Sequence, residues 1–433
     1  MATVASHLQQ ARDLLEAGNP AAALSEAERG LAADTGDVGL LLIAAHALLA
    51  MERSADAADR LEQAIRLQPE RGDAWLGLGA CRLRQGDLRA ARHALEQGLS
   101  RLPDAFLARL QLAECLQALD DNDEALVQYF RATTTAQARG RWLDDRSTAP
   151  ELRERVKSAM RIIDQGRQAL FFGAIAPLAE EYGKDELDRV SCALAGYLGL
   201  GPAGSPDPRQ RPTFFYVPDL QPEPYFDRTL FPWYEALEQA AGAIRGELEQ
   251  QVLRKREGLQ PFLDFSGGAR KSDFLGSQGD LEAAAWDAYF FHRHGDPFEE
   301  HLAACPATAA ALAQVPLTRI DAHAPEVLFS LLSPGTVIKP HHGVTNSRVV
   351  SHLPLIVPPD CALEVGGVVH AWEEGRCVTF DDSFLHQAWN RSDRLRVVMI
   401  LDTWHPRLRP AETLAIRRLV ETIGAFNRRA GVH

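Results

Sequence analysis

Histidines are concentrated in the C-terminal part of the chain, among short apolar runs. His341 and His342 follow one run, and His352 lies within the next. His386 follows the segment FDDSF. Neutral imidazoles at the mouth of a β-barrel can bind a transition metal. The usual non-haem iron triad adds a carboxylate to two histidines, but the position two after His341 is Gly343. Spacing alone therefore leaves two interpretations open, a metal site and histidines in ordinary surface or core positions.

Asp381 and Asp382, which shortly precede His386, are candidates for the missing carboxylate. Adjacent residues of a strand point to opposite faces, so at most one of the two side chains can reach a given metal. We expect these residues to have a structural role, or to orient the metal ligands through hydrogen bonds.

The elements that must position these side chains are short strands. From about residue 325, runs rich in Val, Ile and Leu (EVLFSLL, VVSHLPLIV, CALEV, CVTF, RVVMILDTW) are separated by SPG, PPD, GG and NRSD. Short strands with turn signals at regular spacing indicate a sandwich or barrel, a class that includes jelly rolls. We predict that residues 213–433 form this domain, with a helix at YEALEQAAGAIRGELEQQVL.

The N-terminal third repeats itself every 34 residues: LEQAI at 61–65 returns as LEQGL at 95–99. Small residues keep the same offset in two registers, which are Ala23, Ala57, Ala91 and Ala125, and Gly30, Ala64, Gly98 and Ala132. The period resembles the tetratricopeptide repeat, whose helix pairs stack into a superhelix with a concave binding face. We predict an all-α repeat domain over residues 1–138, with a plain helical bundle as the alternative. A helical connector and a Pro- and Gly-rich linker are predicted over 139–212.

Composition limits the partners of the chain. Its 433 residues carry a formal net charge of -13 without a long basic run, which is unfavourable for nucleic-acid binding. No apolar stretch reaches the ~20 residues of a membrane span, and MATVASHLQQARDLLEAG lacks the features of a signal peptide. The six cysteines form no C-x-x-C pair. We expect a soluble cytoplasmic protein with no nucleic-acid or membrane partner.

The motifs of the C-terminal half are more specific. PHHGVTNSRVVSHLPLIVP is followed by WEEGRCVTFDDSFLHQAWN and RVVMILDTWHP, with FSLLSPGT upstream. Together they resemble the aspartyl/asparaginyl β-hydroxylase family over about residues 214–408. The resemblance implies a double-stranded β-helix, or jelly roll, and therefore an α+β multidomain chain in which a tetratricopeptide-repeat superhelix comes first. It also implies an Fe(II)- and 2-oxoglutarate-dependent dioxygenase, which uses O2 to hydroxylate an unactivated C–H bond.

The resemblance also implies the metal ligands. The family holds iron with two histidines and no protein carboxylate, which makes Gly343 expected. His341 and His386 match the two ligand positions in this sequence. His342 lies between His341 and that glycine and is not assigned to the metal.

The cosubstrate residues follow from the same resemblance. Arg396, which opens RVVMILDTW, matches the arginine whose planar fork holds the distal carboxylate of 2-oxoglutarate. Ser330 matches a serine that assists the carboxylate, and His352 matches a histidine near the cosubstrate. Arg348 matches an arginine near the pocket that faces the substrate. Arg396 and the two ligand histidines are the implied catalytic residues.

One position departs from the family. Val350 stands where vertebrate members have a second arginine, which helps to hold ligand carboxylates, and this affects the expected substrate more than the reaction class. The leading function is hydroxylation of an Asp/Asn-type residue in a peptide or protein that the repeats recruit. One alternative is a hydroxylase of a free or carrier-bound amino acid, and another is a catalytically inactive repeat adaptor. A lipid acyl hydroxylase, also known among relatives, is expected to have membrane-spanning segments.

Overall fold

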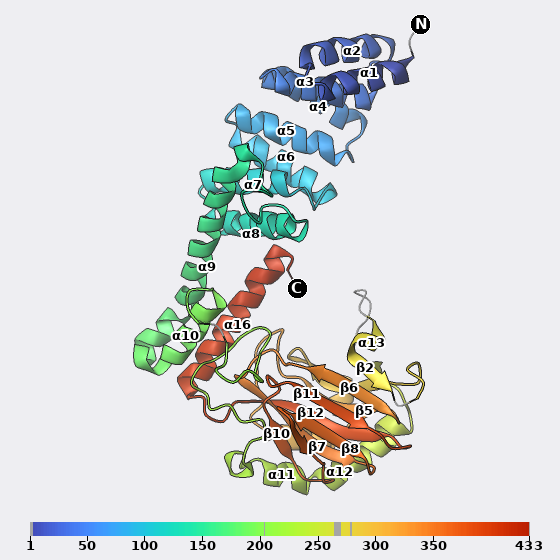
Figure 1. Cartoon of the computed structure of the whole chain (residues 1–433), viewed down its shortest axis with the longest axis vertical. Helices are drawn as coiled ribbons and strands as arrows, with labels where there is room; N and C mark the ends of the chain where they lie inside the picture. The colour runs from blue at the N-terminus through green and yellow to red at the C-terminus, as the bar shows by residue number, and fades with distance from the viewer. Residues whose placement is uncertain (1–2, 203, 264–269, 278, 433) are drawn as a thin grey trace. The chain divides into compact units, whose positions relative to one another are not determined.

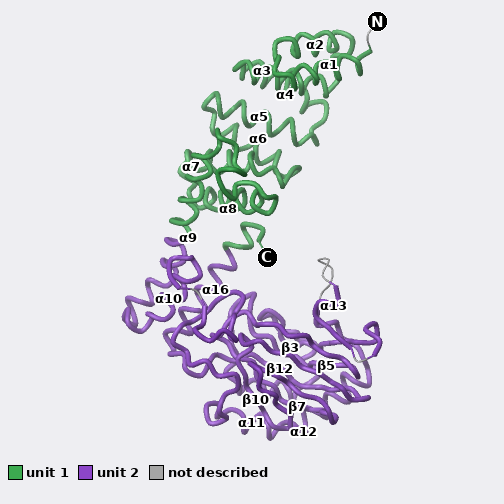
Figure 2. The backbone as a smooth tube through the Cα atoms, in the orientation of Figure 1, with its two compact units in different colours: residues 1–167, 426–433 green, residues 168–425 purple. Residues whose placement is uncertain are grey.

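The computed structural model describes residues 3–202, 204–263, 270–277 and 279–432. They form two compact units, residues 1–167 with 426–433 and residues 168–425, which Figure 2 shows in different colours. The boundaries expected from the sequence, at about 138 and 212, stay predictions.

The first unit consists of helices that pack in sequence order (Figure 1). They are α1 (Val4–Glu16), α2 (Pro20–Ala33), α3 (Val38–Ala50), α4 (Ser54–Leu67), α5 (Gly72–Arg84), α6 (Leu88–Arg101), α7 (Phe106–Ala118) and α8 (Asn122–Ala138). Asn19, Asp37 and Asp87 precede α2, α3 and α6, and each side chain accepts a hydrogen bond from a backbone N–H of the first turn. The predicted N-terminal array of helical repeats is confirmed.

Small residues of the 34-residue period lie where helices touch. A Cβ on Gly98 would lie 2.3 Å from Cδ2 of Leu76. One on Gly79, which shares the 34-residue offset with Ala45 and Ala113, would lie 2.6 Å from Cγ of Leu95. Ala57, at another position of the period, has no exposed surface. Larger side chains would push α5 and α6 apart, so the period in the sequence is a period of helix packing.

After the repeats, η1 (Pro150–Leu152) leads into α9 (Arg153–Tyr182). Within the first unit, Arg155 of α9 donates two hydrogen bonds, of 2.8 and 2.7 Å, to the Glu114 carboxylate of α7. Both α9 and α16 (Pro410–Ala430) have residues in both units. None of the helices in the described ranges combines the length and the apolar composition that a membrane crossing needs.

The second unit contains two antiparallel sheets (Figure 1). The seven-stranded sheet has the order β1-β3-β5-β12-β7-β10, with β4 beside β3, and the five-stranded sheet has the order β2-β6-β11-β8-β9. The strands are β1 (Gln260–Pro261), β2 (Leu275–Ser277), β3 (Trp286–Arg293), β4 (Asp296–Pro297), β5 (Val327–Leu332), β6 (Thr336–His341), β7 (Arg348–Ile356), β8 (Cys361–Val365), β9 (Val368–His370), β10 (Val378–Phe380), β11 (His386–Asn390) and β12 (Arg396–Trp404). The predicted C-terminal β domain is confirmed, and its assignment as a jelly roll stays a prediction.

The second unit also contains shorter helices. They are η2 (Lys184–Leu187), α10 (Asp188–Tyr197), η3 (Arg228–Leu230), α11 (Tyr234–Gln239), α12 (Ala241–Glu247), η4 (Leu248–Leu253), α13 (Lys271–Phe274), α14 (Glu299–Ala304) and α15 (Pro306–Leu312). The helix predicted within 234–253 is thus divided into α11, α12 and η4, since the α11 hydrogen-bond pattern ends with the N–H of Ala240 bound to the carbonyl of Ala236.

Alternation along β12 shows how the layers form. Val397, Met399 and Leu401 pack into a core shared with α11, α12 and α15, which cover one face of the seven-stranded sheet. Val398 points the other way and packs with Leu363 of β8 in a core between the two sheets. The inward face of β12 therefore supplies residues to the space between the sheets.

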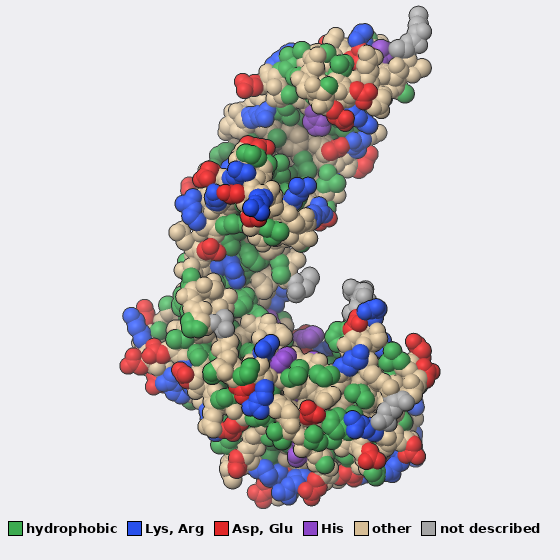
Figure 3. Space-filling model, in the orientation of Figure 1, with side chains coloured by type: hydrophobic (Ala, Val, Ile, Leu, Met, Phe, Trp, Pro, Cys, Tyr) green, Lys and Arg blue, Asp and Glu red, His purple; other side chains and the backbone are tan. Residues whose placement is uncertain are grey.

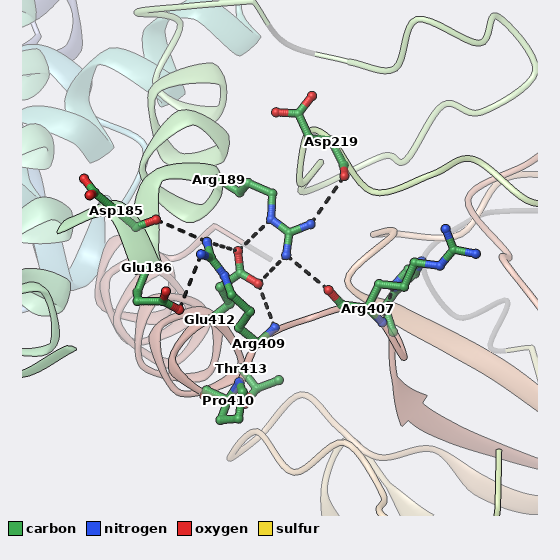
Figure 4. Close-up of polar contacts among 10 residues, drawn as sticks. Asp185, Glu186, Arg189, Asp219, Arg407, Arg409, Pro410, Glu412 and Thr413 are labelled. Atoms are coloured by element: carbon green, nitrogen blue, oxygen red, sulfur yellow. Dashed lines mark hydrogen bonds and ion pairs between the residues drawn. The ribbon is translucent and has the colours of Figure 1, made fainter. Parts of the chain in front are cut away.

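A buried ion-pair cluster fixes the start of α16 (Figure 4). Glu412 has no exposed surface and accepts hydrogen bonds of 2.7 and 2.5 Å from Arg189 of α10. Arg409 donates its backbone N–H and a guanidinium N–H to the same carboxylate. Burial alone would raise the pKa of Glu412, but the hydrogen bonds from both arginines outweigh it and hold the pKa below its ordinary value. The cluster joins α16 to α10 within the second unit.

Candidate active site

A cavity of about 170 Å³ is lined by residues from both sheets. Side chains alternate along a strand, and the residues of β5, β7 and β12 that line the cavity belong to one face of each strand. The six site residues predicted from the sequence all line this cavity, and they are His341, His386, Arg396, Ser330, Arg348 and His352. Their assignment to metal and cosubstrate stays a prediction.

His341 and His386 face each other across two paired strands. They are opposite in the register of β6 and β11, and their ring centroids are 4.1 Å apart. Nδ1 of His341 lies 2.8 Å from the Lys339 carbonyl oxygen, and Nδ1 of His386 lies 2.9 Å from that of Phe384. A carbonyl only accepts, so each Nδ1 carries the proton and each Nε2 keeps its lone pair. Burial lowers the pKa of His386 to about 3, which keeps it neutral. Two such imidazoles can ligate a transition metal.

His342, in contrast, does not line the cavity. Its Nδ1 lies 3.0 Å from the carbonyl oxygen of Ser383. Its position next to His341 therefore provides a natural comparison between a cavity histidine and a structural one.

The position two after His341 has no room for a side chain. A Cβ on Gly343 would lie 2.2 Å from Cγ of Asp382, so the Asp382 carboxyl group fills that space. Asp381 points elsewhere and accepts hydrogen bonds from Gln210 and Ser383. Within the described ranges, no group of three or more His, Cys, Asp or Glu side chains is arranged to hold a metal. At position 343 itself, no side chain can therefore join His341 and His386 as a third metal ligand.

Arg396 is a buried cation without a carboxylate partner in the described part of the chain. It is 1% exposed, and its Nε has no hydrogen-bond partner among the described residues. Its Cζ lies 5.0 Å from the centroid of the Trp372 ring. Burial lowers the pKa of Arg396 to about 10, which leaves it charged at neutral pH. A buried charge without a counter-ion is unfavourable, so this position fits an anionic ligand.

Ser330 lies beside Arg396 in the cavity. Its Oγ accepts hydrogen bonds from Nε1 of Trp286 at 2.9 Å and from Nη1 of Arg396 at 3.3 Å. Both partners are donors only, so the Ser330 hydroxyl proton is available to another acceptor. The serine and the arginine can therefore both donate to one carboxylate in the cavity.

His352 lies on the same face of β7 as Arg348. Burial, together with the nearby Arg396, holds the pKa of His352 well below its ordinary value, so the ring is neutral. In the described part of the chain its Nδ1 has no hydrogen-bond partner, and the rings of Trp372 and Phe380 lie 5.8 and 5.0 Å away, centroid to centroid. A neutral imidazole can accept or donate a hydrogen bond to a neighbouring ligand without adding charge.

A second polar group, which the motifs did not predict, includes Asp402 and Glu326. Nη1 of Arg348 lies 2.9 Å from Oδ2 of Asp402, and the same oxygen accepts the backbone N–H of Glu326 at 2.8 Å. Glu326 Oε1 accepts the backbone N–H of His294 at 2.7 Å. Alternation from Arg396 places Asp402 on the inner face of β12, which is a signal that the sequence contains. Glu326 directly precedes β5 and has no comparable signal.

Family comparisons match the region that contains this cavity. A model described as "Aspartyl/Asparaginyl beta-hydroxylase" matches residues 238–406, which include all six predicted site residues. Residues 238–406 are an aspartyl/asparaginyl β-hydroxylase domain. Tetratricopeptide repeats precede the hydroxylase domain, with matches at residues 42–88 and 81–140. The family predicted from the motifs is therefore confirmed.

Curated relatives resemble the hydroxylase domain. The ornithine lipid ester-linked acyl 2-hydroxylase of Rhizobium tropici is 35% identical over 192 residues, which are 43% of this chain and 63% of that protein. Aspartate beta-hydroxylase domain-containing protein 2 of Mus musculus is 35% identical, covering 48% of this chain and 58% of its own. The human aspartyl/asparaginyl beta-hydroxylase is 31% identical, covering 42% and 24%. This chain thus spans less than two thirds of the length of these relatives.

Among solved structures, MamA is 22% identical, with a TM-score of 0.30, covering 32% of this chain and 80% of its own. A tetratricopeptide-repeat protein of Thermus thermophilus is 25% identical, with a TM-score of 0.30, covering 36% and 80%.

Proposed function

We propose that this protein is an Fe(II)- and 2-oxoglutarate-dependent dioxygenase that hydroxylates a residue of a peptide or protein recruited by the repeats. One observation carries the proposal: the cavity combines two imidazoles whose Nε2 atoms keep their lone pairs and a buried arginine without a carboxylate partner among the described residues. The imidazoles suit the metal, and the arginine suits a dianionic cosubstrate. The names of the relatives point to aspartyl or asparaginyl targets, and a cytoplasmic location is part of the proposal.

The chain itself would hold and orient the reactants. Arg396 and Ser330 would donate hydrogen bonds to the distal carboxylate of 2-oxoglutarate, while His341 and His386 would hold the metal through Nε2. Apolar cavity residues such as Leu328 exclude water from the site. A metal held there would supply the chemistry of O2: one oxygen atom would enter the substrate C–H bond, and the other would enter 2-oxoglutarate, which would leave as succinate and CO2.

The Rhizobium tropici relative supports a second candidate, hydroxylation of a lipid acyl group. A free or carrier-bound amino acid and an inactive adaptor stay as the alternatives predicted from the sequence. The enzyme proposals share the metal and cosubstrate sites and differ in the acceptor, so product analysis with peptide and lipid acceptors separates them.

Histidine variants test the reaction class. In the full-length protein, His341→Ala and His386→Ala should each lower Fe(II) affinity and abolish 2-oxoglutarate consumption, because one imidazole cannot hold the metal alone. His342→Ala should retain most of both, since its ring bonds to the Ser383 carbonyl outside the cavity. Iron stoichiometry and succinate formation are the measurements. Full turnover by His341→Ala or His386→Ala at limiting iron would contradict the ligand assignment.

A further inference from the structure

The charged groups of the cavity do not balance. Its lining contains two arginines, Arg348 and Arg396, and three carboxyl groups, Glu326, Asp382 and Asp402. Histidines that bind a metal do so as neutral imidazoles and add no charge. Ferrous iron and the 2-oxoglutarate dianion carry equal and opposite charges. With the three carboxyl groups ionised, binding both therefore leaves an excess of one negative charge in the cavity.

The charge of Arg348 is already paired within the cavity, although its buried Nε has no hydrogen-bond partner among the described residues. Its Nη1 already lies 2.9 Å from the Asp402 carboxylate, and the opposite charges of these two groups cancel. Val350, the next inward residue of β7, adds no charge at the position where the family resemblance implies a second arginine. Glu326 and Asp382 are then the carboxyl groups without an arginine or lysine partner among the described residues.

Asp382 points to a missing cation more directly. It lines the cavity, is 8% exposed, and its Oδ1 is buried without a hydrogen-bond partner in the described part of the chain. Glu326 reaches the same cavity from the residue before β5, with 20% of its side chain exposed. The side chain beside Glu326 is His294, whose Nδ1 lies 2.9 Å from Oε1 of Glu326, and burial lowers the pKa of His294, which favours its neutral form. Neither carboxyl group therefore has a permanent cation paired with it among the described residues.

We propose that the substrate brings a cationic group, an ammonium or a guanidinium, into the cavity beside Glu326 and Asp382. In a recruited peptide, a lysyl or arginyl side chain supplies this group. The inference rests on the proposed function and narrows its substrate class. An aspartyl side chain would add a second negative charge to the excess, whereas a cation removes it and forms charge-assisted hydrogen bonds with the two carboxylates.

Matched peptides test the inference on the full-length protein. Mn(II) replaces iron, 2-oxoglutarate is present, and calorimetry measures binding of blocked glycine pentapeptides with Lys, Arg, norleucine or Asp at the centre. Lys and Arg peptides should bind at least about tenfold more tightly than the norleucine and Asp peptides, as expected for hydrogen bonds between charged groups. Glu326→Gln should remove most of this preference. Glu300→Gln, which removes an exposed carboxylate of α14, should preserve it.

Consumption of 2-oxoglutarate by the iron-loaded protein without peptide is measured in parallel and tests the proposed function by itself. Consumption combined with equal or tighter binding of the Asp peptide would overturn the inference and leave the proposed function standing. A Lys and Arg preference that survives Glu326→Gln unchanged would also overturn it. Absence of consumption would remove the proposed function, and the inference that rests on it.

Discussion

Arg396 is almost completely buried and has no carboxylate partner among the described residues. We therefore expect cosubstrate binding to depend on the shape of its guanidinium as well as on its charge. Arg396→Lys retains a cation but loses the planar fork. We expect the KM for 2-oxoglutarate to rise about 10- to 150-fold, from the loss of roughly 1.5–3 kcal/mol, while Fe(II) binding stays intact. Succinate formation at varied 2-oxoglutarate measures this, with exposed Arg394→Lys as the control. An unchanged KM would indicate that Arg348 holds the dianion instead.

Glu326 should make stability depend on pH. Burial raises its pKa from 4.5 to about 7, so the folded protein binds this proton more tightly than the unfolded chain does. The stabilisation of the folded protein by this proton is complete below the unfolded-state pKa of 4.5 and is lost as pH rises through about 7. Glu326→Gln, neutral at every pH, should therefore gain stability relative to wild type between about pH 5 and pH 8, approaching about 3 kcal/mol. Urea unfolding of metal-free protein measures this, and a pH-independent difference would refute it.

At the residue scale, the motifs indicated side chains but not the register that brings them together. His341 and His386 face each other because β6 and β11 pair in that register. Ser330 receives the Trp286 hydrogen bond because β3 pairs with β5. Register depends on contacts between distant segments, which no local pattern encodes. Asp402 was predictable, since alternation along one strand is a local property.

At the scale of elements, the Glu412 cluster should control how firmly α16 joins α10. Glu412→Ala would leave Arg189 and Arg409 without their buried carboxylate, and removing one partner of a buried ion pair costs about 3–5 kcal/mol. Chemical unfolding of the full-length protein measures the loss. Glu421→Ala, on the same helix, breaks a half-exposed pair with Arg417 and should cost less than about 1 kcal/mol. Equal losses in the two variants would mean that the cluster adds no special stability.

Elements with a strong local pattern were predictable, and their arrangement was not. The 34-residue period reports helix packing because Gly98 and Gly79 touch neighbouring helices at positions that repeat. The runs rich in Val, Ile and Leu identified β5, β7 and β12 because β-branched and aliphatic side chains favour half-buried strands. The order β5-β12-β7 places the last strand of the chain between two earlier ones, and it follows from long-range pairing.

At the scale of the whole molecule, the sequence did not show that the end of the chain belongs to the first compact unit. Residues 426–433 join residues 1–167, and Phe426 packs edge-on against Phe130, with ring centroids 5.2 Å apart. A single domain boundary in the sequence cannot assign two separate segments, residues 1–167 and 426–433, to one unit. The sequence has no long basic run, and the surface agrees with this: acidic and basic side chains are mixed over both units on the face in Figure 3.

The compact units suggest how to separate binding of the target from chemistry. Residues 168–425 contain every side chain that we assign to metal, cosubstrate and substrate charge. This fragment, shown to be folded by a cooperative thermal transition, should still consume 2-oxoglutarate slowly without a target. It should hydroxylate a protein target at least about a hundredfold more slowly than the full chain at low target concentration, because the repeats raise the effective concentration at the cavity. Rates for both proteins on the same target are the measurement. Equal rates would exclude recruitment by the repeats and favour a small or carrier-bound substrate.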